Sequence, residues 1–532
     1  MTKYVFVTGG VLSSLGKGIA TASIGRILKN RGIKVTFLKI DPYINVDPGT
    51  LSPYQHGEVY VTEDGAETDL DLGHYERFVG IKLTRINNFT TGQIYYSVIQ
   101  RERMGDYRGK TVQVVPHVIE EIILRIKGTN RNNRYQAVLV ELGGTIGDIE
   151  SQPFTEAIRQ MKLKLKKNVL HIHLVLVPYI KTAGELKTKP AQHSVKTLNE
   201  LGLQPDILLC RTEKPLPDSI REKLSLFCNV EKEAVIQAVD VDNIYKIPTN
   251  FKKVGLDKVL LDKIQIKASK NDQQWDKMVE KINKIHNRIT IGLVGKYVEL
   301  HDAYKSVIEA LTHGGIENNV LVQIKWIQSE FIHDKTDLKD ICGLLVPGGF
   351  GERGIEGKIQ VIKVAREHGI PFLGLCLGMQ CAIIEYARHV LHKHDAHSTE
   401  FKTDCHDPVI DIIETKKNIK QIGGTLRKGG YLCHLKRDSK AYRIYKQDEI
   451  TERHRHRYEF NNQYRKIFSD SGMVFSGLYK EKDLVEIIEL PRHPFFIGVQ
   501  FHPEFQSRPD RAHPLFSAFI KASLDFKKSE EE

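Results

Sequence analysis

Residues 4–18 read YVFVTGGVLSSLGKG and pass from an apolar strand directly into a glycine-rich loop. Glycines at such a turn let backbone N–H groups converge on phosphate oxygens, and the following helix presents its positive end. The loop departs from the standard phosphate-binding motif. Five residues separate Gly10 from Gly16, and Gly18 stands where a serine or threonine usually ligates magnesium. We predict a phosphate site rather than an ordinary strand-to-helix turn, with Ser14 or carboxylates elsewhere holding any metal.

The same pattern of apolar runs and glycine or polar turns continues along the chain. The first half contains the runs YVFVTGG, KVTFLKID, AVLVELGG, LHIHLVLVPY and DILLCRT. Such runs, alternating with longer mixed segments, are typical of a parallel sheet flanked by helices. After a charged stretch, a second series begins with ITIGLVGKY and ends with FFIGVQFH. We predict an α/β protein with two doubly wound domains: a P-loop-like parallel sheet over 1–265, a linker over 266–288 and a second domain over 289–532.

The length of the chain fits this organisation, because 532 residues exceed what one hydrophobic core usually spans. No run of 18 apolar residues occurs, so we expect no contact with a membrane, and the glycine-rich beginning is unlike a signal peptide. The seven cysteines show no Cys-x-x-Cys spacing and indicate neither a disulfide framework nor a zinc site. We expect a cytoplasmic protein.

The formal net charge of +12 has two explanations. One is a nucleic-acid partner. The other is a basic proteome, or ligands that are polyanions such as nucleotides. Because the lysines are scattered and no aromatic-basic RNA motif occurs, we expect no nucleic-acid partner.

Several charged residues follow predicted strands, where the ligands of parallel sheets gather. Lys39 ends the second strand, Glu141 ends a later one, and Asp71 lies in the acidic loop GAETDLDLGHYERF. A pair of carboxylates from separate strand ends could hold Mg²⁺ between nucleotide phosphates. The acidic loop could also be a solvated surface, whereas an acid within the apolar run at Glu141 needs a partner. The lysine pair within residues 187–192 suits a triphosphate, although such pairs are often only solvated.

Motifs in the second half indicate a reactive thiol. Cys376 lies in PFLGLCLGMQ, a glycine-flanked strand, turn and helix that exposes the sulfur at a helix N-terminus. His502 and Glu504, in QFHPE, would supply a base and its orienting carboxylate. The glycines of VPGGFG, residues 346–351, could bind an oxyanion. Most cytosolic cysteines are buried and structural, as we expect for Cys381, but the His-x-Glu pair favours a nucleophile at Cys376.

These motifs resemble known families over nearly the entire chain. VPGGFG, GLCLG and HPE are similar to class I glutamine amidotransferases, while FVTGGVLSSLGKG, ELGGTIGDIES, KTKPAQHSVK and ERHRHRYE resemble the CTP synthase family. The resemblance implies a synthetase domain followed by a class I glutamine amidotransferase domain. It implies that ATP phosphorylates the uracil C4 oxygen of UTP and that ammonia from glutamine then displaces phosphate, giving CTP. The stretch around residues 414–424 is shorter than in many members of the family. This difference affects only an expected surface hairpin.

The resemblance also implies roles for individual residues. For ATP these are Ser14, Leu15, Gly16, Lys17, Gly18, Ile19, Lys39 and Asp71, and for Mg²⁺ they are Asp71 and Glu141. For UTP and CTP they are Ser13, Asp148, Ile149, Glu150, Lys187, Thr188, Lys189, Pro190, Ala191, Gln192 and Lys223. For glutamine they are Tyr54, Gly349, Leu377, Gly378, Met379, Gln380, Glu400 and Arg457, beside the catalytic Cys376, His502 and Glu504. The resemblance further implies feedback inhibition by CTP, allosteric activation by GTP and a homotetramer.

Two rival functions stay open at this point. An amidotransferase of similar architecture that activates a carboxylate would hydrolyse ATP without any dependence on UTP. A nucleotide-gated assembly or RNA-binding protein with a vestigial thiol domain would be favoured by a missing triad member, and none is missing.

Overall fold

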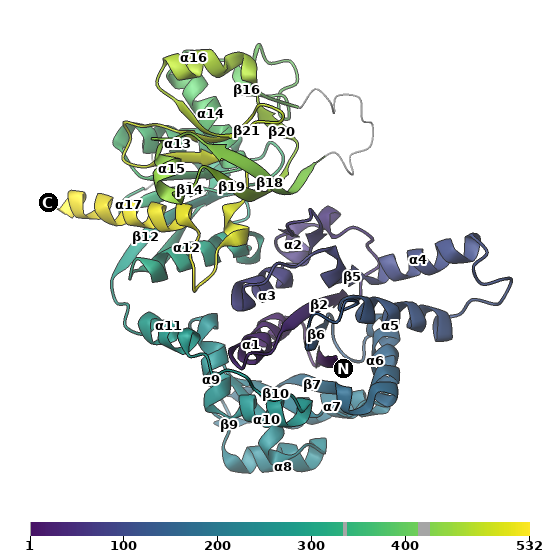
Figure 1. Ribbon diagram of the computed structural model, residues 1–532. Coiled ribbons are helices and arrows are strands. Elements are labelled where there is room, and N and C mark those ends of the chain that lie inside the picture. Colours follow the sequence, from purple (N-terminus) through teal and green to yellow (C-terminus); the bar gives the residue numbers. More distant parts are fainter. Residues whose placement is uncertain (1, 333–337, 413–425, 532) are drawn as a thin grey trace. The chain divides into compact units, whose positions relative to one another are not determined.

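The computed structural model describes residues 2–332, 338–412 and 426–531, so the hairpin expected around residues 414–424 lies outside the described residues. The chain divides into two compact units. One comprises Met1–Thr50 and Asp71–Glu280, and the other Leu51–Leu70 and Lys281–Glu532. Each has the predicted α/β architecture, with helices packed against a sheet (Figure 1). Within the described ranges, no helix has the length and apolarity that a membrane crossing requires.

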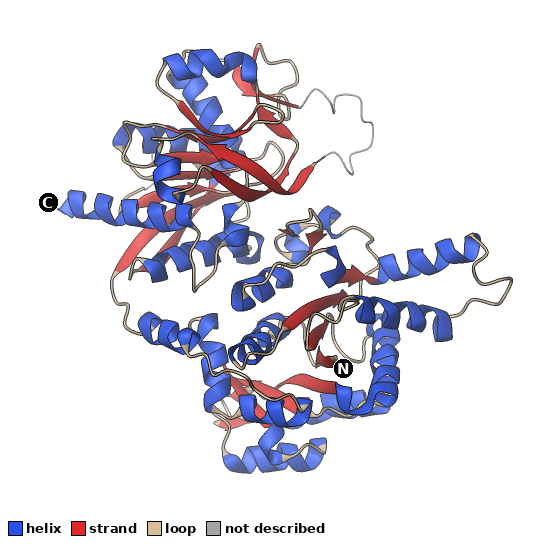
Figure 2. Cartoon of the chain, in the orientation of Figure 1, coloured by secondary structure: helices blue, strands red, loops and turns tan. Residues whose placement is uncertain are grey.

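The first unit is built on a fully parallel sheet, seven-stranded over the residues described, in the order β11-β10-β7-β1-β6-β2-β5. Figure 2 shows strands in red and helices in blue. All residues of the central strand β1 are buried, as expected for a strand covered by helices on both faces. Its strands are β1 (Lys3–Gly9), β2 (Val35–Asp41), β5 (Asn88–Thr90), β6 (Ala137–Leu142), β7 (Val169–Leu176), β10 (Ile207–Thr212) and β11 (Val235–Val239), with a small hairpin of β8 (Tyr179–Ile180) and β9 (Glu185–Leu186). Its helices are α1 (Lys17–Asn30), α3 (Asp71–Val79), α4 (Thr91–Arg103), α5 (Ile119–Gly128), α6 (Gln152–Leu165), α7 (Lys189–Glu200), α8 (Asp218–Cys228), α9 (Ile247–Lys253), α10 (Leu256–Ile264) and α11 (Gln274–Ile282).

Part of the stretch predicted as a linker packs within this first unit. Trp275, on α11, is buried, with ring centroids 5.5 Å from Phe78 and 6.0 Å from Tyr245. The Arg26 guanidinium lies 4.5 Å from the centroid of the indole ring. Residues 266–288 therefore include a buried aromatic residue, Trp275. The charged character of this stretch, which led to the linker prediction, gave no sign of it.

The second unit contains a mixed sheet, nine-stranded over the described ranges, in the order β13-β12-β14-β15-β23-β22-β21-β18-β19. The first five strands of this order are mutually parallel and the remaining pairings are antiparallel. Its large strands are β12 (Arg288–Gly295), β13 (Leu321–Gln328), β14 (Gly343–Val346), β15 (Phe372–Leu375), β18 (Arg427–Leu435), β19 (Glu449–His456), β21 (Val474–Tyr479), β22 (Leu484–Glu489) and β23 (Phe496–Val499). Smaller strands are β3 (Tyr60–Val61), β4 (Glu67–Thr68), β16 (Ala396–Ser398), β17 (Asp407–Ile412) and β20 (Tyr458–Phe460).

Helices cover both faces of this sheet and enclose two apolar clusters. On α17, Leu515, Phe516, Phe519 and Ile520 are buried, because their spacing places them on one side of the helix. The helices are α2 (Pro53–His56), α12 (Lys305–Glu317), α13 (Ile355–His368), α14 (Leu377–His389), α15 (Lys440–Tyr445), α16 (Arg465–Asp470) and α17 (Pro514–Glu531).

A short excursion of the N-terminal half, residues 51–70, belongs to the second unit. Its Tyr60 is fully buried there, where its hydroxyl donates to the Phe505 carbonyl (3.1 Å) and accepts from Arg453 (2.9 Å). No local sequence pattern predicted this excursion, since it is held by partners almost four hundred residues away in the chain.

Candidate functional site

The contacts of the loop between β1 and α1 explain why its sequence departs from the standard phosphate-binding motif. Gly16 has φ of 95°, which favours glycine, and Lys17 begins α1 with its ammonium donating to the Gly144 carbonyl at 2.7 Å. A Cβ on Gly18 would lie 1.8 Å from an oxygen of Asp71. Residue 18 must therefore be glycine, and a carboxylate approaches the loop where a hydroxyl usually stands. Burial lowers the pKa of Lys17.

Lys39, Asp71 and Glu141 form a buried charge cluster beside this loop. The Lys39 ammonium donates to Asp71 and, at 3.1 Å, to Glu141, whose other oxygen accepts from the Tyr75 hydroxyl. Burial raises the pKa of Glu141 to about 7, reinforced by the charge of Asp71 and opposed by Lys39. The sequence thus correctly predicted that side chains from separate strand ends would meet.

The two carboxylates fit a magnesium ion shared with a nucleotide. Among the residues described, no group of three or more His, Cys, Asp or Glu side chains could hold a metal. Mg²⁺ is commonly bound by one or two carboxylates together with substrate phosphates, so Asp71 and Glu141 beside a phosphate loop form a suitable donor set.

The residues expected to bind UTP and CTP lie on three segments. Ser13, in the phosphate loop, is exposed, as are Asp148, Ile149 and Glu150 after β6. Asp148 lies close enough to Lys17 to act on its pKa, in the direction opposite to burial. The phosphate loop and the segment after β6 are therefore neighbours.

Residues 187–192 contain the start of α7, the third of these segments. A Cβ on Gly10 would lie 1.7 Å from the hydroxyl of Ser194, so α7 packs tightly against the phosphate loop. The pKa of Glu185 is lowered mainly by its hydrogen bond from Lys187, with a smaller effect of Lys223 on α8. Lys187 and Lys223 therefore both lie near Glu185.

A cavity of about 400 Å³ beside the phosphate loop was missed by the sequence reasoning. Its lining is mainly apolar, and Arg211 at its edge donates to the Ser14 carbonyl at 2.9 Å. Strand β11 and the residues after it form one wall of this cavity. Ligands of parallel sheets gather at the ends of strands, so the end of β11 was a sequence signal that could have indicated the cavity. The wall and floor include Leu15, Ile19, Ala20, Ala238, Val239, Asp240, Val241, Ile244 and Phe251.

Cys376 occupies a strained turn between β15 and α14. Its φ of 50° and ψ of −100° are unusual for a residue with a side chain, and strain of this kind occurs at nucleophile elbows. A Cβ on Gly378 would lie 2.1 Å from the Val346 carbonyl, so this glycine allows close packing of the turn. The prediction that the turn exposes the sulfur is wrong, because Cys376 is only 3% exposed.

His502 and Glu504 approach Cys376 as the motif predicted. His502 Nδ1 lies 2.7 Å from Glu504 Oε1, and a Cβ on Gly348 would touch both the His502 ring and Cys376. Burial alone would lower the pKa of His502, but Glu504 and Cys376 outweigh it and raise the pKa to about 10. The raised pKa favours the protonated form of His502 next to the sulfur.

The residues expected around glutamine are partly assembled. Glu400 accepts a hydrogen bond from the Gly351 N–H at 3.1 Å. Burial raises the pKa of Glu400, and Arg457 lies close enough to act in the opposite direction. A Cβ on Gly349 would contact the Leu377 side chain, so these two oxyanion candidates are neighbours.

Three other predicted glutamine contacts have side chains engaged elsewhere. Met379 is fully buried in the apolar core. Gln380 donates to the Tyr458 carbonyl at 3.1 Å and to Gln500 at 3.3 Å. Tyr54, on α2, packs edge-on against Tyr297 with centroids 5.1 Å apart.

The excursion at residues 51–70 is fastened close to this thiol. Glu67 accepts from Arg455 at 2.8 Å and from Lys428 at 2.7 Å. The carbonyl of Arg455 is itself 3.9 Å from the Cys376 sulfur. One carboxylate of the N-terminal half therefore anchors a residue that contacts the nucleophile.

Replacing Glu67 with glutamine is expected to lower the free energy of unfolding by about 1–3 kcal/mol, because hydrogen bonds to charged groups are weakened. Burial would raise the pKa of Glu67, but Arg455 and Lys428 hold it below its usual value. The stabilisation is therefore present at neutral pH and lost as the pH falls through the lowered pKa. Thermal unfolding of the variant and of wild type should converge in acid. Glu299→Gln, at an exposed position, is the control, and equal losses in the two variants would contradict this anchor.

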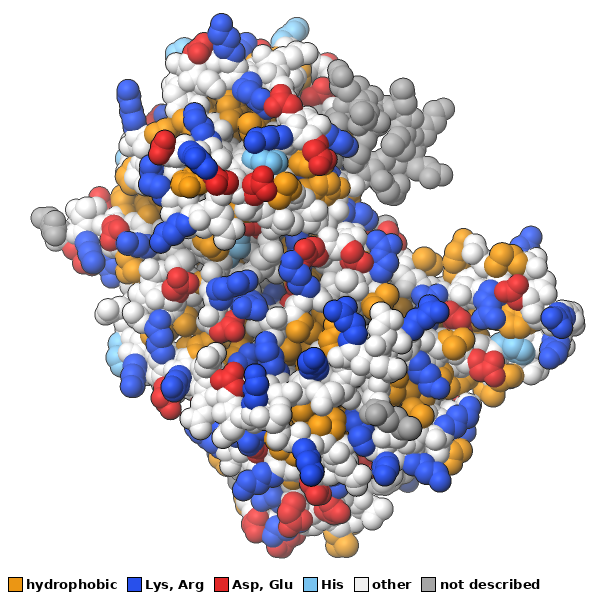
Figure 3. All heavy atoms as spheres, in the orientation of Figure 1, with side chains coloured by type: hydrophobic (Ala, Val, Ile, Leu, Met, Phe, Trp, Pro, Cys, Tyr) orange, Lys and Arg blue, Asp and Glu red, His pale blue; other side chains and the backbone are white. Residues whose placement is uncertain are grey.

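On the face drawn in Figure 3, the basic charge is dispersed: Lys and Arg side chains are interspersed with Asp and Glu. This distribution agrees with the scattering of lysines along the sequence.

Comparison with known proteins gives matches along the chain. Residues 3–266 match the family model described as CTP synthase N-terminus, and residues 299–522 match glutamine amidotransferase class-I. A CTP synthase of Clostridium kluyveri is 57% identical over 531 residues, and one of Clostridium beijerinckii is 55% identical over 533 residues. Both alignments cover 99% of this chain and 99% of the relative. The solved glutaminase domain of Trypanosoma brucei CTPS with bound acivicin is 34% identical, covering 44% of this chain and 94% of that one, with a TM-score of 0.42.

Proposed function

We propose that this chain, which belongs to the CTP synthase family, makes CTP from UTP, ATP and glutamine. One observation carries the proposal: the same chain has a phosphate loop beside buried carboxylates and a thiol beside an imidazole–carboxylate pair. The first arrangement suits activation of a substrate by ATP, and the second suits release of ammonia from an amide.

In the N-terminal site, Lys17 and Lys39 would neutralise charge on the phosphates while the γ-phosphoryl group passes to the uracil C4 oxygen. That oxygen leaves poorly as it stands and leaves well as phosphate once ammonia has attacked C4. Asp71 and Glu141 would hold Mg²⁺, which would supply further neutralisation of the triphosphate. Residues 14–19 would bind ATP. Ser13, residues 148–150, residues 187–192 and Lys223 would bind UTP or CTP.

In the C-terminal site, the Cys376 thiolate would attack the amide carbon of glutamine. His502 would protonate the departing ammonia, and water would then cleave the thioester to give glutamate. Backbone N–H groups of Gly349 and Leu377 would bind the oxyanion. Glu400 and Arg457 would bind the α-ammonium and α-carboxylate, since an arginine fork matches a carboxylate. Tyr54, Gly378, Met379 and Gln380 complete the proposed glutamine contacts, with Met379 acting through its backbone.

The cavity beside the phosphate loop is proposed to bind the adenine of ATP, because apolar walls with a few polar groups suit a flat base. Ala238→Leu would fill this space and is expected to raise the KM for ATP about tenfold or more. A single methylene group gained or lost in an apolar pocket already changes binding by about this factor. The KM for UTP and the rate of glutamine hydrolysis should stay near wild type. Initial rates at varied ATP measure the effect, and an unchanged KM would place the adenine elsewhere.

We further propose that residues 1–265 carry the synthetase function and residues 289–532 the glutaminase function, with residues 51–70 packed in the second unit and residues 266–280 in the first. We also propose a cytoplasmic location, inhibition by CTP and activation by GTP. A homotetramer is supported by large apolar side chains exposed on α4 and beyond it. They include Tyr96, Ile99, Met104 and Leu124.

The decisive experiment follows CTP formation by absorbance with UTP, ATP, Mg²⁺ and either glutamine or ammonia. CTP should form with both nitrogen donors, and ATP hydrolysis should depend on UTP. ATP hydrolysis that ignores UTP would instead favour an amidotransferase that activates a carboxylate.

A further inference from the structure

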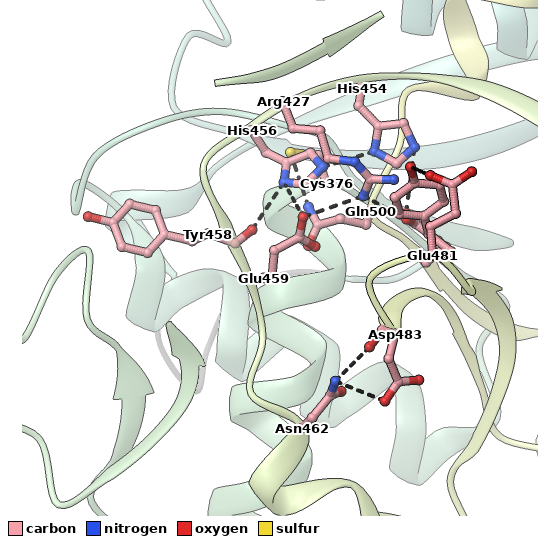
Figure 4. A network of polar contacts seen from close by, with 12 residues as sticks. Cys376, Arg427, His454, His456, Tyr458, Glu459, Asn462, Glu481, Asp483 and Gln500 are labelled. Atoms are coloured by element: carbon pink, nitrogen blue, oxygen red, sulfur yellow. Dashed lines mark hydrogen bonds and ion pairs between the residues drawn. The ribbon is translucent and has the colours of Figure 1, made fainter. Parts of the chain in front are cut away.

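Gln500, the residue that follows β23, lies against the nucleophile. Its side chain is fully buried, and its amide nitrogen is 3.6 Å from the Cys376 sulfur. Figure 4 shows Gln500 next to Cys376 within a network of buried polar side chains. The glutaminase chemistry described above makes no use of this amide.

The orientation of the Gln500 amide follows from its neighbours. The Tyr458 carbonyl can only accept, so the Gln380 side chain must present its NH₂ group to it, at 3.1 Å. The same NH₂ group donates to the Gln500 oxygen at 3.3 Å. The Gln500 oxygen is thereby occupied, and its NH₂ group must face the sulfur. A flipped Gln500 would lose the bond from Gln380 and turn an oxygen lone pair toward the thiolate.

We propose that Gln500 is a further catalytic residue of the glutaminase site, which donates an amide N–H to the Cys376 thiolate and stabilises it before attack. Gln380 is the positioning residue that fixes the direction of this donor. The inference rests on the proposed function, because it takes Cys376 as the nucleophile. A hydrogen bond to a charged acceptor is stronger than one to a neutral acceptor, so the amide stabilises the thiolate more than the thiol.

Ionisable groups face Cys376 from two directions. His502 lies directly beside it, backed by Glu504. Gln500 also belongs to the polar network of Figure 4. The buried ionisable members labelled there are Arg427 on β18, His454 and His456 on β19 and Glu459 on β20. Arg427 is also paired with the buried Glu486 on β22, whereas the labelled Glu481 and Asp483 are exposed.

Ion pairs and hydrogen bonds link several members of that network. Arg427 lies 2.6 Å from Glu486 and 3.4 Å from Glu459. His456 Nδ1 is 3.1 Å from the Tyr458 carbonyl, so it carries the proton, and His456 Nε2 accepts from His454 at 2.9 Å. The Tyr458 carbonyl thus accepts from both His456 and Gln380, and the network fixes the acceptor on which the direction of the Gln500 amide depends.

The test is the pH dependence of iodoacetamide labelling of Cys376 in the full-length enzyme, read by peptide mass. Gln500→Met keeps the length of the side chain and removes the donor. We expect labelling at neutral pH to fall about 10- to 100-fold, the range for one hydrogen bond to a charged group. In alkaline solution, labelling should match wild type. The kcat/KM for glutamine should fall by a similar factor.

Gln463→Met makes the same chemical change at an exposed position and should label like wild type. Gln380→Met tests the positioning role: labelling without glutamine should fall as well, whereas a residue that only binds glutamine would change KM alone. If Gln500→Met unfolds, Gln500→Glu keeps the shape and should suppress labelling even further at neutral pH.

Three outcomes would overturn the proposal. They are a wild-type pH profile in Gln500→Met, a decrease that is uniform at every pH, and unchanged labelling in Gln500→Glu. A wild-type enzyme that neither hydrolyses glutamine nor labels at Cys376 would instead overturn the proposed function.

Discussion

Replacing Cys376 with alanine is expected to abolish CTP formation from glutamine while leaving CTP formation from ammonia intact. The thioester cannot form without the sulfur, and loss of a nucleophile commonly costs on the order of 10⁴- to 10⁶-fold in rate. Ammonia added to the solution bypasses this step, because the phosphate loop and its carboxylates belong to the other unit. Both rates are measured in one absorbance assay that differs only in the nitrogen donor.

Cys381→Ala is the matched control for this result. Cys381 lies on the same helix, and burial raises the pKa of its thiol to about 12, so it cannot serve as a thiolate. Both activities should persist in this variant. Equal loss with glutamine and with ammonia in Cys376→Ala would refute the assignment of separate sites.

Replacing Lys17 with alanine is expected to remove CTP formation with either donor. Lys17 begins α1 within the phosphate loop, and its charge would stabilise the phosphoryl group in transfer. Removing one such stabilising group typically costs about 10²- to 10³-fold in rate. The measurement is the initial rate at saturating ATP, with glutamine and ammonia in parallel.

Glutamine hydrolysis provides the internal control for Lys17→Ala, because the triad lies in the second unit. Hydrolysis without CTP formation would show that the variant is folded and specifically defective. A variant that makes CTP normally from ammonia would remove Lys17 from the proposed mechanism.

The sequence predicted those parts of the protein that local patterns encode. The apolar runs before Gly9 and Cys376 are buried strands, since a strand covered on both faces needs a continuous apolar run. The His-x-Glu pair was recognisable because His502 and Glu504 are close in the chain. Glu141 was correctly expected to have a partner, because an unpaired buried acid is costly.

Features that depend on tertiary packing were not predictable in the same way. In the sequence, Gly18 stands where the standard motif has a serine or threonine hydroxyl. Only the position of Asp71 in the structure shows why no side chain fits there. The hydrogen bonds of the Gln380 amide to Tyr458 and Gln500 were not predictable either, because these partners are 78 and 120 residues away in the chain. The cavity beside the phosphate loop depends on how β11 and the following helix close around the loop, which no single segment encodes.

The packing of residues 51–70 within the second unit limits how gene segments that encode this protein can be exchanged. The polypeptide passes between its two units three times, so the second unit is not a contiguous stretch of the gene. A fragment beginning at residue 281 would lack the phenol of Tyr60 and the carboxylate of Glu67 that Arg453 and Arg455 contact. The C-terminal half taken alone would therefore lose these two contacts. Recombination that exchanged it between relatives would keep them matched only if the segment from the beginning of the gene were transferred as well.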